Sequence, residues 1–475
     1  MRIITHFLSQ AFLLIIISSV NVNAQTNVNA QTNVQKSVLD YYEQEQSLQS
    51  AFLGMHVVDM MEDSAIVDIN SNKSMLPASL VKLFTTAAAL NYLGEDFRFK
   101  TYISHTGTVD EKGVLNGNLV VHGAGDPTLG SKHFRDQKYF IDTIVQRVID
   151  YGITSIKGEI IIDCSIFDSQ SIPTSWVWED LGRSYAAGVY PISMNDNVFS
   201  ITFTNPNKDG EERKGLSKVN NANPPSVPAS PYELASEDSL DVSQKNGSFV
   251  VRGSIPAPQE ILGLELIQRF FKLGVCDYRQ DFIPVVIPVP GIVDTIAVLT
   301  SPRLQEIIAV TNEKSINNYA EHLVKYLGYT VYNDGSFSVG TKVVTDFIDS
   351  VGVSNRGVYL YDGSGLSRYN TLTAKHVTDF LNSLSPLTFY PSFYNSLSKP
   401  EKDGTLKSYN FPEYMHRKIH AKTGSMTRVR NIAGYMTTKS GKHISFCIML
   451  NGHTCDARTS KKGITTLLTT IYNTY

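Results

Sequence analysis

Three strand-like segments that follow one another near the end of the chain constrain its fold more than any other feature. The segments RKIHAKTGSM, RNIAGYMTT and HISFCIMLNG lie within residues 417–452 and are joined by short turns. Strands with connections this short pair antiparallel with their chain neighbours. Near the N-terminus, FLGMHVVDM and SAIVDIN have the composition of two more strands around a turn at residues 61–63. The sequence therefore predicts one five-stranded antiparallel sheet built from both ends of the chain.

Helical patterns surround these strands, so the predicted fold class is α+β, with the sheet flanked by helices. Residues 35–49 have helical periodicity, and an apolar helix opens near residue 77. A helix-rich stretch runs from 302 to about 410, and a closing helix covers 460–475. Between them, residues 97–291 contain many short strands and one or two helices. A chain of 475 residues is too long for one simple core. We predict one domain from residues 35–96 and 292–475, with a β-rich insertion of two subdomains at 97–291.

The first 24 residues have the pattern of an export leader. Arg2 precedes an apolar run from Phe7 to Val20, and small residues end at Ala24 before Gln25. An uncleaved membrane anchor is the alternative, but the apolar run is short and a polar segment follows it. The hexamer NVNAQT occurs twice, so residues 25–34 are expected to form a disordered spacer. We therefore predict export to the periplasm, with no stable membrane anchor.

The composition narrows the classes of partner. A net charge of −3 gives no reason to expect nucleic acid or an anionic membrane surface as the main partner. The spacing of Cys164, Cys276, Cys447 and Cys455 matches no zinc pattern, and no HExxH motif is present. One or two disulfides are compatible with export, although Cys447 lies in a strand where a free core thiol is an equal alternative. We expect no metal and no cofactor.

Ser79 and Lys82 are the first candidate catalytic pair. They lie three residues apart at the start of the apolar segment PASLVKLFTTAAAL, so one helical turn places them on the same face. A serine hydroxyl becomes a strong nucleophile only when a base takes its proton, and a lysine can be that base only if burial or a nearby cation lowers its pKa. Alone, the pair is better explained by a helix N-cap serine, because Ser-x-x-Lys occurs by chance in many proteins.

Two further motifs are weak when each is taken alone. Lys422, Thr423, Gly424 and Ser425 form a basic strand segment in which Gly424 lets a substrate backbone approach closely. Ser315, Ile316 and Asn317 lie in the helix-rich stretch, where a capping motif is the usual explanation. Their order along the chain is the stronger signal, because Ser-x-x-Lys, then Ser-x-Asn, then Lys-Thr-Gly is the motif set of β-lactamases and penicillin-binding proteins.

With these motifs the chain resembles class C low-molecular-mass penicillin-binding proteins, the D-alanyl-D-alanine carboxypeptidase and endopeptidase family. Four further stretches carry the resemblance: MLPASLVK, GAGDPTL, YDGSGLSR and AKTGSM with RNIAGY. The long interval between Lys82 and Ser315 fits that family's inserted domains, and the resemblance covers essentially the whole mature chain. It implies a β-lactamase/transpeptidase-like catalytic domain. Ile316 departs from the acidic residue that is common in Ser-x-Asn, which affects only fine tuning.

The resemblance also implies a role for each motif residue. Ser79 would attack the penultimate D-Ala carbonyl, Lys82 would take its proton, and Ser315 would pass a proton to the leaving amine. Asn317 would hold the substrate backbone. In the last motif, Lys422 would poise Lys82 and Ser315 electrostatically, and Thr423 would bind the terminal carboxylate. Gly424 would allow close approach, and Ser425 would share the oxyanion hole with Ser79 through backbone N–H groups.

The predicted function is that of an exported serine-type D-Ala-D-Ala carboxypeptidase, with endopeptidase activity on cross-links as an extension. Its predicted partners are peptidoglycan stem peptides ending in D-Ala-D-Ala and β-lactams such as penicillin, which would acylate Ser79. A β-lactamase or esterase on the same scaffold is the enzymatic alternative, and the large insertion argues against it. A non-catalytic peptidoglycan-binding protein is the other alternative, and it has no need of a paired Ser79 and Lys82.

Overall fold

The structure is a computed structural model that describes residues 33–45, 48–204, 217–219, 241–245, 248–277, 279–402 and 404–475. The predicted leader at residues 1–24 and most of the predicted spacer at 25–34 lie outside these residues. The described chain forms two compact units. The first comprises the described residues up to Pro77 with Leu372–Pro386 and Leu397–Tyr475, and the second comprises Ala78–Thr371 with Leu387–Ser396.

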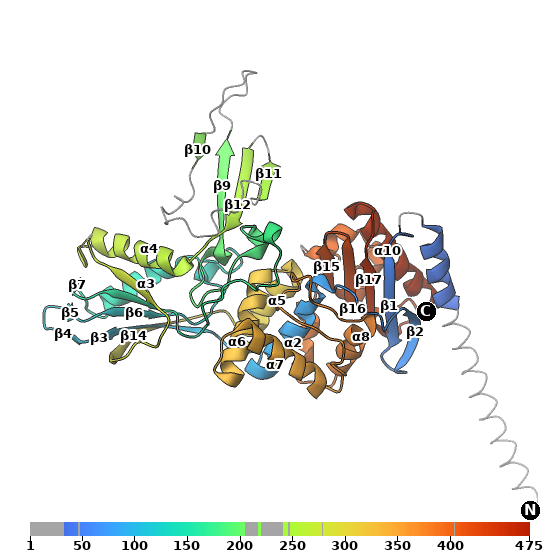
Figure 1. Cartoon of the computed structure of the whole chain (residues 1–475), viewed down its shortest axis with the longest axis horizontal. Coiled ribbons are helices and arrows are strands. Elements are labelled where there is room, and N and C mark those ends of the chain that lie inside the picture. The colour runs from blue at the N-terminus through green and yellow to red at the C-terminus, as the bar shows by residue number, and fades with distance from the viewer. Residues whose placement is uncertain are drawn as a thin grey trace, which may run out of the picture. The chain divides into compact units, whose positions relative to one another are not determined.

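The first unit contains the predicted five-stranded sheet. Its order is β15-β16-β17-β1-β2, and each neighbouring pair is antiparallel. The strands are β1 (Phe52–Asp59), β2 (Ser64–Ile69), β15 (Ile419–Met426), β16 (Val429–Thr437) and β17 (His443–Asn451). Figure 1 shows these strands side by side. The prediction of one antiparallel sheet made from both ends of the chain is confirmed.

Helices cover both faces of this sheet. On β1, Met55 and Val57 belong to a core that also contains side chains of α10 (Ala457–Thr474) and of the helical residues 33–44. Between them, His56 points the other way and its Nδ1 lies 2.5 Å from Thr378 Oγ1 on α8 (Ala374–Ser383). Because successive strand residues alternate between faces, a strand buried on both sides is apolar almost throughout.

The helices of the second unit surround α2 (Val81–Leu93). Every residue from Val81 to Leu90 is buried, as expected for a helix that is apolar on all sides. Its neighbours in this unit are α5 (Leu304–Lys314), α6 (Asn317–Tyr332), α7 (Phe337–Ser350) and α9 (Tyr390–Ser396). The Ser-x-x-Lys motif at Ser79 and Lys82 therefore lies at the start of the central helix of its unit.

Among its described residues, the second unit also contains three sheets. The largest has the order β13-β8-β6-β3-β14, from β13 (Phe282–Val285), β8 (Ile160–Asp163), β6 (Leu119–His122), β3 (Lys100–Thr106) and β14 (Ile292–Thr300). Two helices, α3 (Phe140–Asp150) and α4 (Pro258–Lys272), share a core with it. A second sheet joins β9 (Val198–Thr204), β10 (Ser217–Val219), β11 (Asp241–Lys245) and β12 (Ser248–Ser254). The third joins β4 (Thr108–Val109), β5 (Val114–Asn116) and β7 (Ser155–Ile156).

Strand β14 begins just after the predicted end of the insertion at residue 291, yet it pairs with β3 inside the predicted insertion. The division at residues 97 and 291 stays a prediction.

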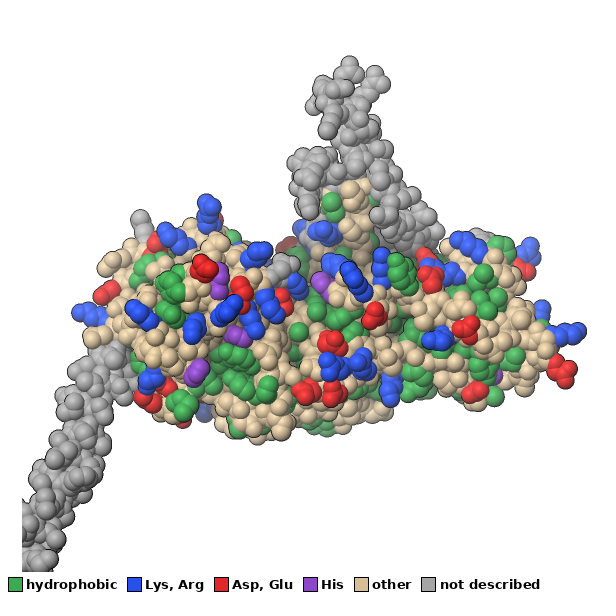
Figure 2. All heavy atoms as spheres, turned by 180° about the vertical axis from the view of Figure 1, so that it is seen from behind, with side chains coloured by type: hydrophobic (Ala, Val, Ile, Leu, Met, Phe, Trp, Pro, Cys, Tyr) green, Lys and Arg blue, Asp and Glu red, His purple; other side chains and the backbone are tan. Residues whose placement is uncertain are grey.

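The charged side chains and the cysteines are distributed as follows. Figure 2 shows basic and acidic side chains interspersed over the visible face. All four cysteines are free thiols, and Cys447 is fully buried in β17, which is the free-thiol alternative for that residue. Among the described residues, no helix combines the length and apolar character needed to cross a membrane.

Candidate active site

Ser79 and Lys82 occupy the transition into the central helix. Ser79 is in the short 3-10 turn Ala78–Leu80, which runs directly into α2. The one-turn spacing brings Lys82 Nζ within 3.0 Å of Ser79 Oγ. Ser79 is half-buried, whereas the Lys82 side chain is 0% exposed. The predicted shared face is therefore present, with the hydroxyl at the rim and the amine beneath it.

Lys82 Nζ has three oxygen neighbours. Besides Ser79 Oγ, it lies 2.6 Å from Asn317 Oδ1 and 2.8 Å from the carbonyl oxygen of Ser364. An amide oxygen and a carbonyl oxygen can only accept hydrogen bonds, while a serine hydroxyl can both donate and accept. The amine therefore has two obligatory acceptors and one partner whose role depends on protonation.

Burial decides the electrostatics of this lysine. Desolvation lowers the pKa of Lys82 to about 7, and the carboxylates of Glu321 and Asp362 act in the opposite direction. The neutral amine, which a general base requires, is then accessible near neutral pH. An exposed lysine with its ordinary pKa near 10.4 would be almost entirely protonated under the same conditions.

Glu321 is a site residue that the sequence reasoning missed. It is fully buried on α6, one turn after Asn317, and its two carboxylate oxygens each accept a bond of 2.8 Å from the backbone N–H groups of Gly363 and Ser364. Burial, followed by the charge of Asp362, raises the pKa of Glu321, although hydrogen bonds and Lys82 oppose the rise. The spacing of four residues places Glu321 on the same helix face as Asn317, which the sequence could have indicated. No local sequence pattern indicates that the Glu321 carboxylate contacts Gly363 and Ser364.

The loop DGSGLSR, residues 362–368, lies against the turn that carries Ser79. Asp362 organises it by accepting hydrogen bonds from the backbone N–H groups of Gly365 and Ser367 and from Trp176 Nε1. Gly365 has a φ of +85°, and a Cβ placed there would lie 1.9 Å from the carbonyl oxygen of Ala78 and 3.1 Å from the amide nitrogen of Ser79. Glycine is therefore required here both by conformation and by space.

Ser315 and Asn317 flank the junction of two helices. Ser315 ends α5 in a left-handed conformation with a φ of 60°, and Asn317 begins α6. This turn directs the Asn317 amide toward Lys82, and its Nδ2 donates a 2.8 Å bond to the carbonyl oxygen of Tyr185. Asn317 thus joins the Ser79–Lys82 pair directly. The role of Ser315 as a proton relay stays a prediction.

A cavity of about 440 Å³ opens beside these two residues within the second unit. Ser315 and Asn317 line it together with three basic or imidazole side chains, Lys132, His133 and Arg252. One acidic side chain, Asp196, also lines it, but accepts a 2.9 Å hydrogen bond from Tyr319. The cavity therefore favours a ligand that carries negative charge.

The last predicted motif lies on β15, at the edge of the sheet in the first unit. Lys422 is fully buried, and its Nζ donates a 2.8 Å bond to the carbonyl oxygen of Thr423. Gly424 pairs with Asn431 on β16, and the Ser425 hydroxyl accepts a hydrogen bond from Arg430. An edge strand can pair with an extended peptide through backbone hydrogen bonds. Ser79, Lys82, Ser315 and Asn317 thus belong to one unit, and Lys422–Ser425 belong to the other.

Comparison with known proteins gives a consistent result. A model of the D-Ala-D-Ala carboxypeptidase 3 (S13) family matches residues 34–270 and 287–471. A D-alanyl-D-alanine carboxypeptidase of Actinomadura sp. (strain R39) is 27% identical over 446 residues, covering 87% of this chain and 80% of that protein. The D-alanyl-D-alanine carboxypeptidase DacB of Haemophilus influenzae is 26% identical over 431 residues, covering 86% and 87%.

The fold has a counterpart among solved structures. The crystal structure of penicillin binding protein 4 (dacB) from Haemophilus influenzae matches with a TM-score of 0.77 and 24% identity, over 92% of this chain and 99% of that one. This likeness confirms the predicted fold class. Because the family model spans most of the sequence, the chain belongs to the D-Ala-D-Ala carboxypeptidase 3 (S13) family and is a serine-type peptidase.

Proposed function

We propose that this chain is an exported D-Ala-D-Ala carboxypeptidase that acts through an acyl-enzyme on Ser79. The observation that carries the proposal is the set of contacts around Lys82. A fully buried lysine with a lowered pKa lies 3.0 Å from a half-exposed serine hydroxyl and has two fixed acceptors on its other sides. A lysine kept for stability alone would be better placed with its ammonium group in water.

Proton transfer follows from these contacts. In the neutral amine, two N–H bonds donate to Asn317 Oδ1 and the Ser364 carbonyl, which leaves the nitrogen lone pair directed at Ser79. The serine hydroxyl then donates to Lys82, and its proton passes to Nζ as Oγ attacks the carbonyl carbon of the penultimate D-Ala. The C–N bond to the terminal D-Ala breaks, and the amine leaves with a proton delivered through Ser315. Water then hydrolyses the ester on Ser79 and restores the hydroxyl.

The remaining motif residues are assigned by the family resemblance. Asn317 holds the substrate backbone, Thr423 binds the terminal carboxylate, and Lys422 supplies positive charge that favours an unprotonated Lys82. Gly424 removes a side chain where the substrate backbone approaches. Backbone N–H groups of Ser79 and Ser425 stabilise the negative oxygen of the tetrahedral intermediate, a type of interaction worth about 3–4 kcal/mol per donor.

The same nucleophile accounts for two extensions of the activity. A β-lactam presents a strained amide carbonyl that Ser79 opens to form a penicilloyl ester, so we propose that penicillin acylates this residue. Endopeptidase action on cross-links needs space for a peptide beyond the scissile bond. The cavity beside Ser315 and Asn317, with its basic lining, supports that use on peptidoglycan, whose stem peptides carry carboxylates.

Release of D-Ala tests the proposal directly. The purified chain should release D-Ala from a diacylated tripeptide that ends in D-Ala-D-Ala, and Ser79→Ala should lose about 10⁴-fold or more in rate. The exposed Ser74→Ala is the matched control and should retain the rate. Equal activity of Ser79→Ala and the parent chain would overturn the assignment of the nucleophile.

A further inference from the structure

A second and larger cavity lies on the sheet β13-β8-β6-β3-β14, away from the motif residues. Ile103 of β3 belongs to the core shared with α3 and α4, while its neighbours Lys100, Tyr102 and Ser104 line a cavity of about 860 Å³. None of the eight predicted site residues lines this cavity. One face of the sheet is thus an ordinary apolar core, and parts of the other face are polar and open.

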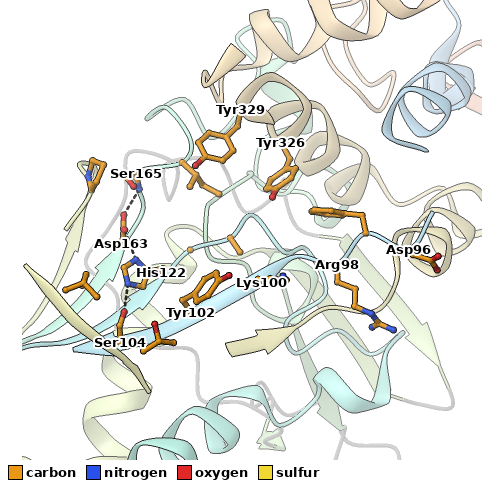
Figure 3. Close-up of a pocket in the computed structure, with 17 residues that line it drawn as sticks. Asp96, Arg98, Lys100, Tyr102, Ser104, His122, Asp163, Ser165, Tyr326 and Tyr329 are labelled. Atoms are coloured by element: carbon orange, nitrogen blue, oxygen red, sulfur yellow. Dashed lines mark hydrogen bonds and ion pairs between the residues drawn. The ribbon is translucent and has the colours of Figure 1, made fainter. Parts of the chain in front are cut away.

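The floor of the cavity is a chain of hydrogen bonds across three strands. His122 Nδ1 on β6 lies 3.0 Å from Asp163 Oδ2 on β8, and His122 Nε2 lies 2.5 Å from Ser104 Oγ on β3. Asp163 Oδ1 also accepts a 2.9 Å bond from the backbone N–H of Ser165 (Figure 3). These groups have the contact order of a hydrolytic triad, but Ser104 is only 1% exposed and is not presented as a nucleophile. Instead they form a rigid polar surface.

The wall opposite this floor is aromatic. Figure 3 shows Tyr326 and Tyr329 of α6 projecting toward Tyr102 on β3. The Tyr326 ring is fixed by Phe99, with centroids 4.7 Å apart, and by Tyr329, at 6.0 Å. Burial, with smaller contributions from Tyr329 and Tyr102, raises the pKa of Tyr326 to about 12, so the Tyr326 phenol keeps its proton and can donate. Tyr102 is 40% exposed, which makes part of this wall accessible.

The cavity is lined by two basic and two acidic side chains. Arg98 and Lys100 are both exposed and line it. Arg98 uses one N–H to donate to the carbonyl oxygen of Ser301 at 2.6 Å, which leaves other guanidinium donors. The two acidic lining residues have basic partners, since Asp96 lies 3.5 Å from Arg303 and Asp163 contacts His122. A ligand here therefore meets donors and positive charge together with aromatic rings.

We propose that this cavity binds the glycan portion of a muropeptide, as a site separate from the one that holds the scissile peptide. A saccharide ring has an apolar face for the tyrosine wall and a rim of oxygen acceptors for the phenol hydroxyls. A carboxylate carried on the lactyl–peptide branch matches Lys100 and Arg98. The identity of the ligand rests on the proposed function, because an enzyme that cleaves a stem peptide within a polymer must accommodate the attached glycan.

Binding of an uncleavable fragment tests this inference. The probe is a reduced N-acetylglucosaminyl-N-acetylmuramyl tripeptide without D-Ala, and the reference ligand is the same tripeptide without sugars, both measured by calorimetry on the full chain. The disaccharide should tighten binding about tenfold or more. Tyr102→Ala and Lys100→Glu should each remove most of that gain, whereas the exposed residues Tyr139 and Lys157, changed to Ala and Glu respectively, should leave it intact.

The rate of acylation by benzylpenicillin is measured on the same variants. It should be unchanged in Tyr102→Ala and Lys100→Glu, which shows that they fold and keep a working Ser79. Equal affinity for the two ligands in the parent chain, or an undiminished sugar-dependent gain in both cavity variants, would overturn the glycan site. If benzylpenicillin does not acylate the parent chain, the result counts against the proposed function instead. Failure of the glycan site and failure of the proposed function are therefore distinguishable.

Discussion

Lys82 is the residue on which the proposed chemistry depends. Burying an ammonium group without water is costly, and the three neighbouring oxygens offset only part of that cost. The consequence is a lysine that loses its proton near neutral pH. The proposed mechanism therefore relies on the burial of Lys82 in the apolar start of α2.

The pH dependence of acylation should follow Lys82. Because the proposed mechanism uses the neutral amine, the rate of reaction with benzylpenicillin should fall as pH drops through about 7 and level off above it. Stopped-flow measurement of the acylation rate across this range gives the midpoint. A midpoint near 10, or a rate that stays constant through neutral pH, would show that Lys82 is not the base.

Glu321→Gln should affect both stability and the pH profile. Glutamine has one side-chain oxygen where the carboxylate has two, so one of the N–H groups of Gly363 and Ser364 loses its acceptor. We expect unfolding free energy to fall by about 1–3 kcal/mol. Because Glu321 raises the pKa of Lys82, its loss should also move the acylation midpoint to lower pH.

A matched variant separates these effects from a general loss of charge. Asp349→Asn changes an exposed carboxylate to an amide at the end of α7 in the same unit. It should leave both the thermal unfolding midpoint and the pH profile close to those of the parent chain. An upward shift of the midpoint in Glu321→Gln would contradict the electrostatic role given to Glu321.

At the scale of elements, the loop at residues 362–368 sets the position of the turn that carries Ser79. Gly365→Ala would place a methyl group against the Ala78 carbonyl and displace this turn. A displacement of about 1 Å can reduce a catalytic rate of the order of 10²-fold, and we expect a loss of that size in penicillin acylation. The strained φ should also reduce stability by about 1 kcal/mol.

Gly352→Ala is the control for backbone strain. Its φ of +84° matches that of Gly365, but a Cβ there would meet no atom within 4 Å. Both variants should lose similar stability from conformation, and only Gly365→Ala should lose acylation rate. Comparable rates in the two variants would show that the loop does not position the nucleophile.

The sequence predicted elements well where local rules decide. Short turns required the antiparallel meander of β15, β16 and β17, and the apolar segment after Ser79 required a buried helix. The sequence did not predict Glu321 as a site residue, because it contacts a loop more than 40 residues away. No local sequence pattern indicates such a contact. The sequence also did not predict the polar floor at Ser104, His122 and Asp163. This floor joins three strands through pairings that sequence alone does not give.

At the scale of the whole molecule, the motif residues come from both compact units. The order Ser79, Lys82, Ser315, Asn317 and then Lys422–Ser425 was enough to suggest the family, because three weak motifs in sequence make a specific combination. The sequence did not predict what the β-rich region binds or does. Its larger cavity follows from the alternation of faces in a sheet whose register only the structure provides.

The predicted export also concerns the whole molecule. Expressed with its leader in a Gram-negative host, the chain should appear in the periplasmic fraction with Gln25 as its first residue, because small residues precede that position. N-terminal sequencing of the recovered protein checks the cleavage site. Recovery from the membrane fraction with the leader intact would favour the anchor alternative.

The most direct test of the central claim is intact-protein mass spectrometry after incubation with benzylpenicillin. The parent chain should gain the mass of one penicillin molecule, and Ser79→Ala should gain none, since the ester forms on the Ser79 hydroxyl beside Lys82. A single adduct that persists in Ser79→Ala would place the nucleophile elsewhere and contradict the account. If the parent chain shows neither an adduct nor turnover of benzylpenicillin, the motif residues do not carry out the chemistry proposed for them.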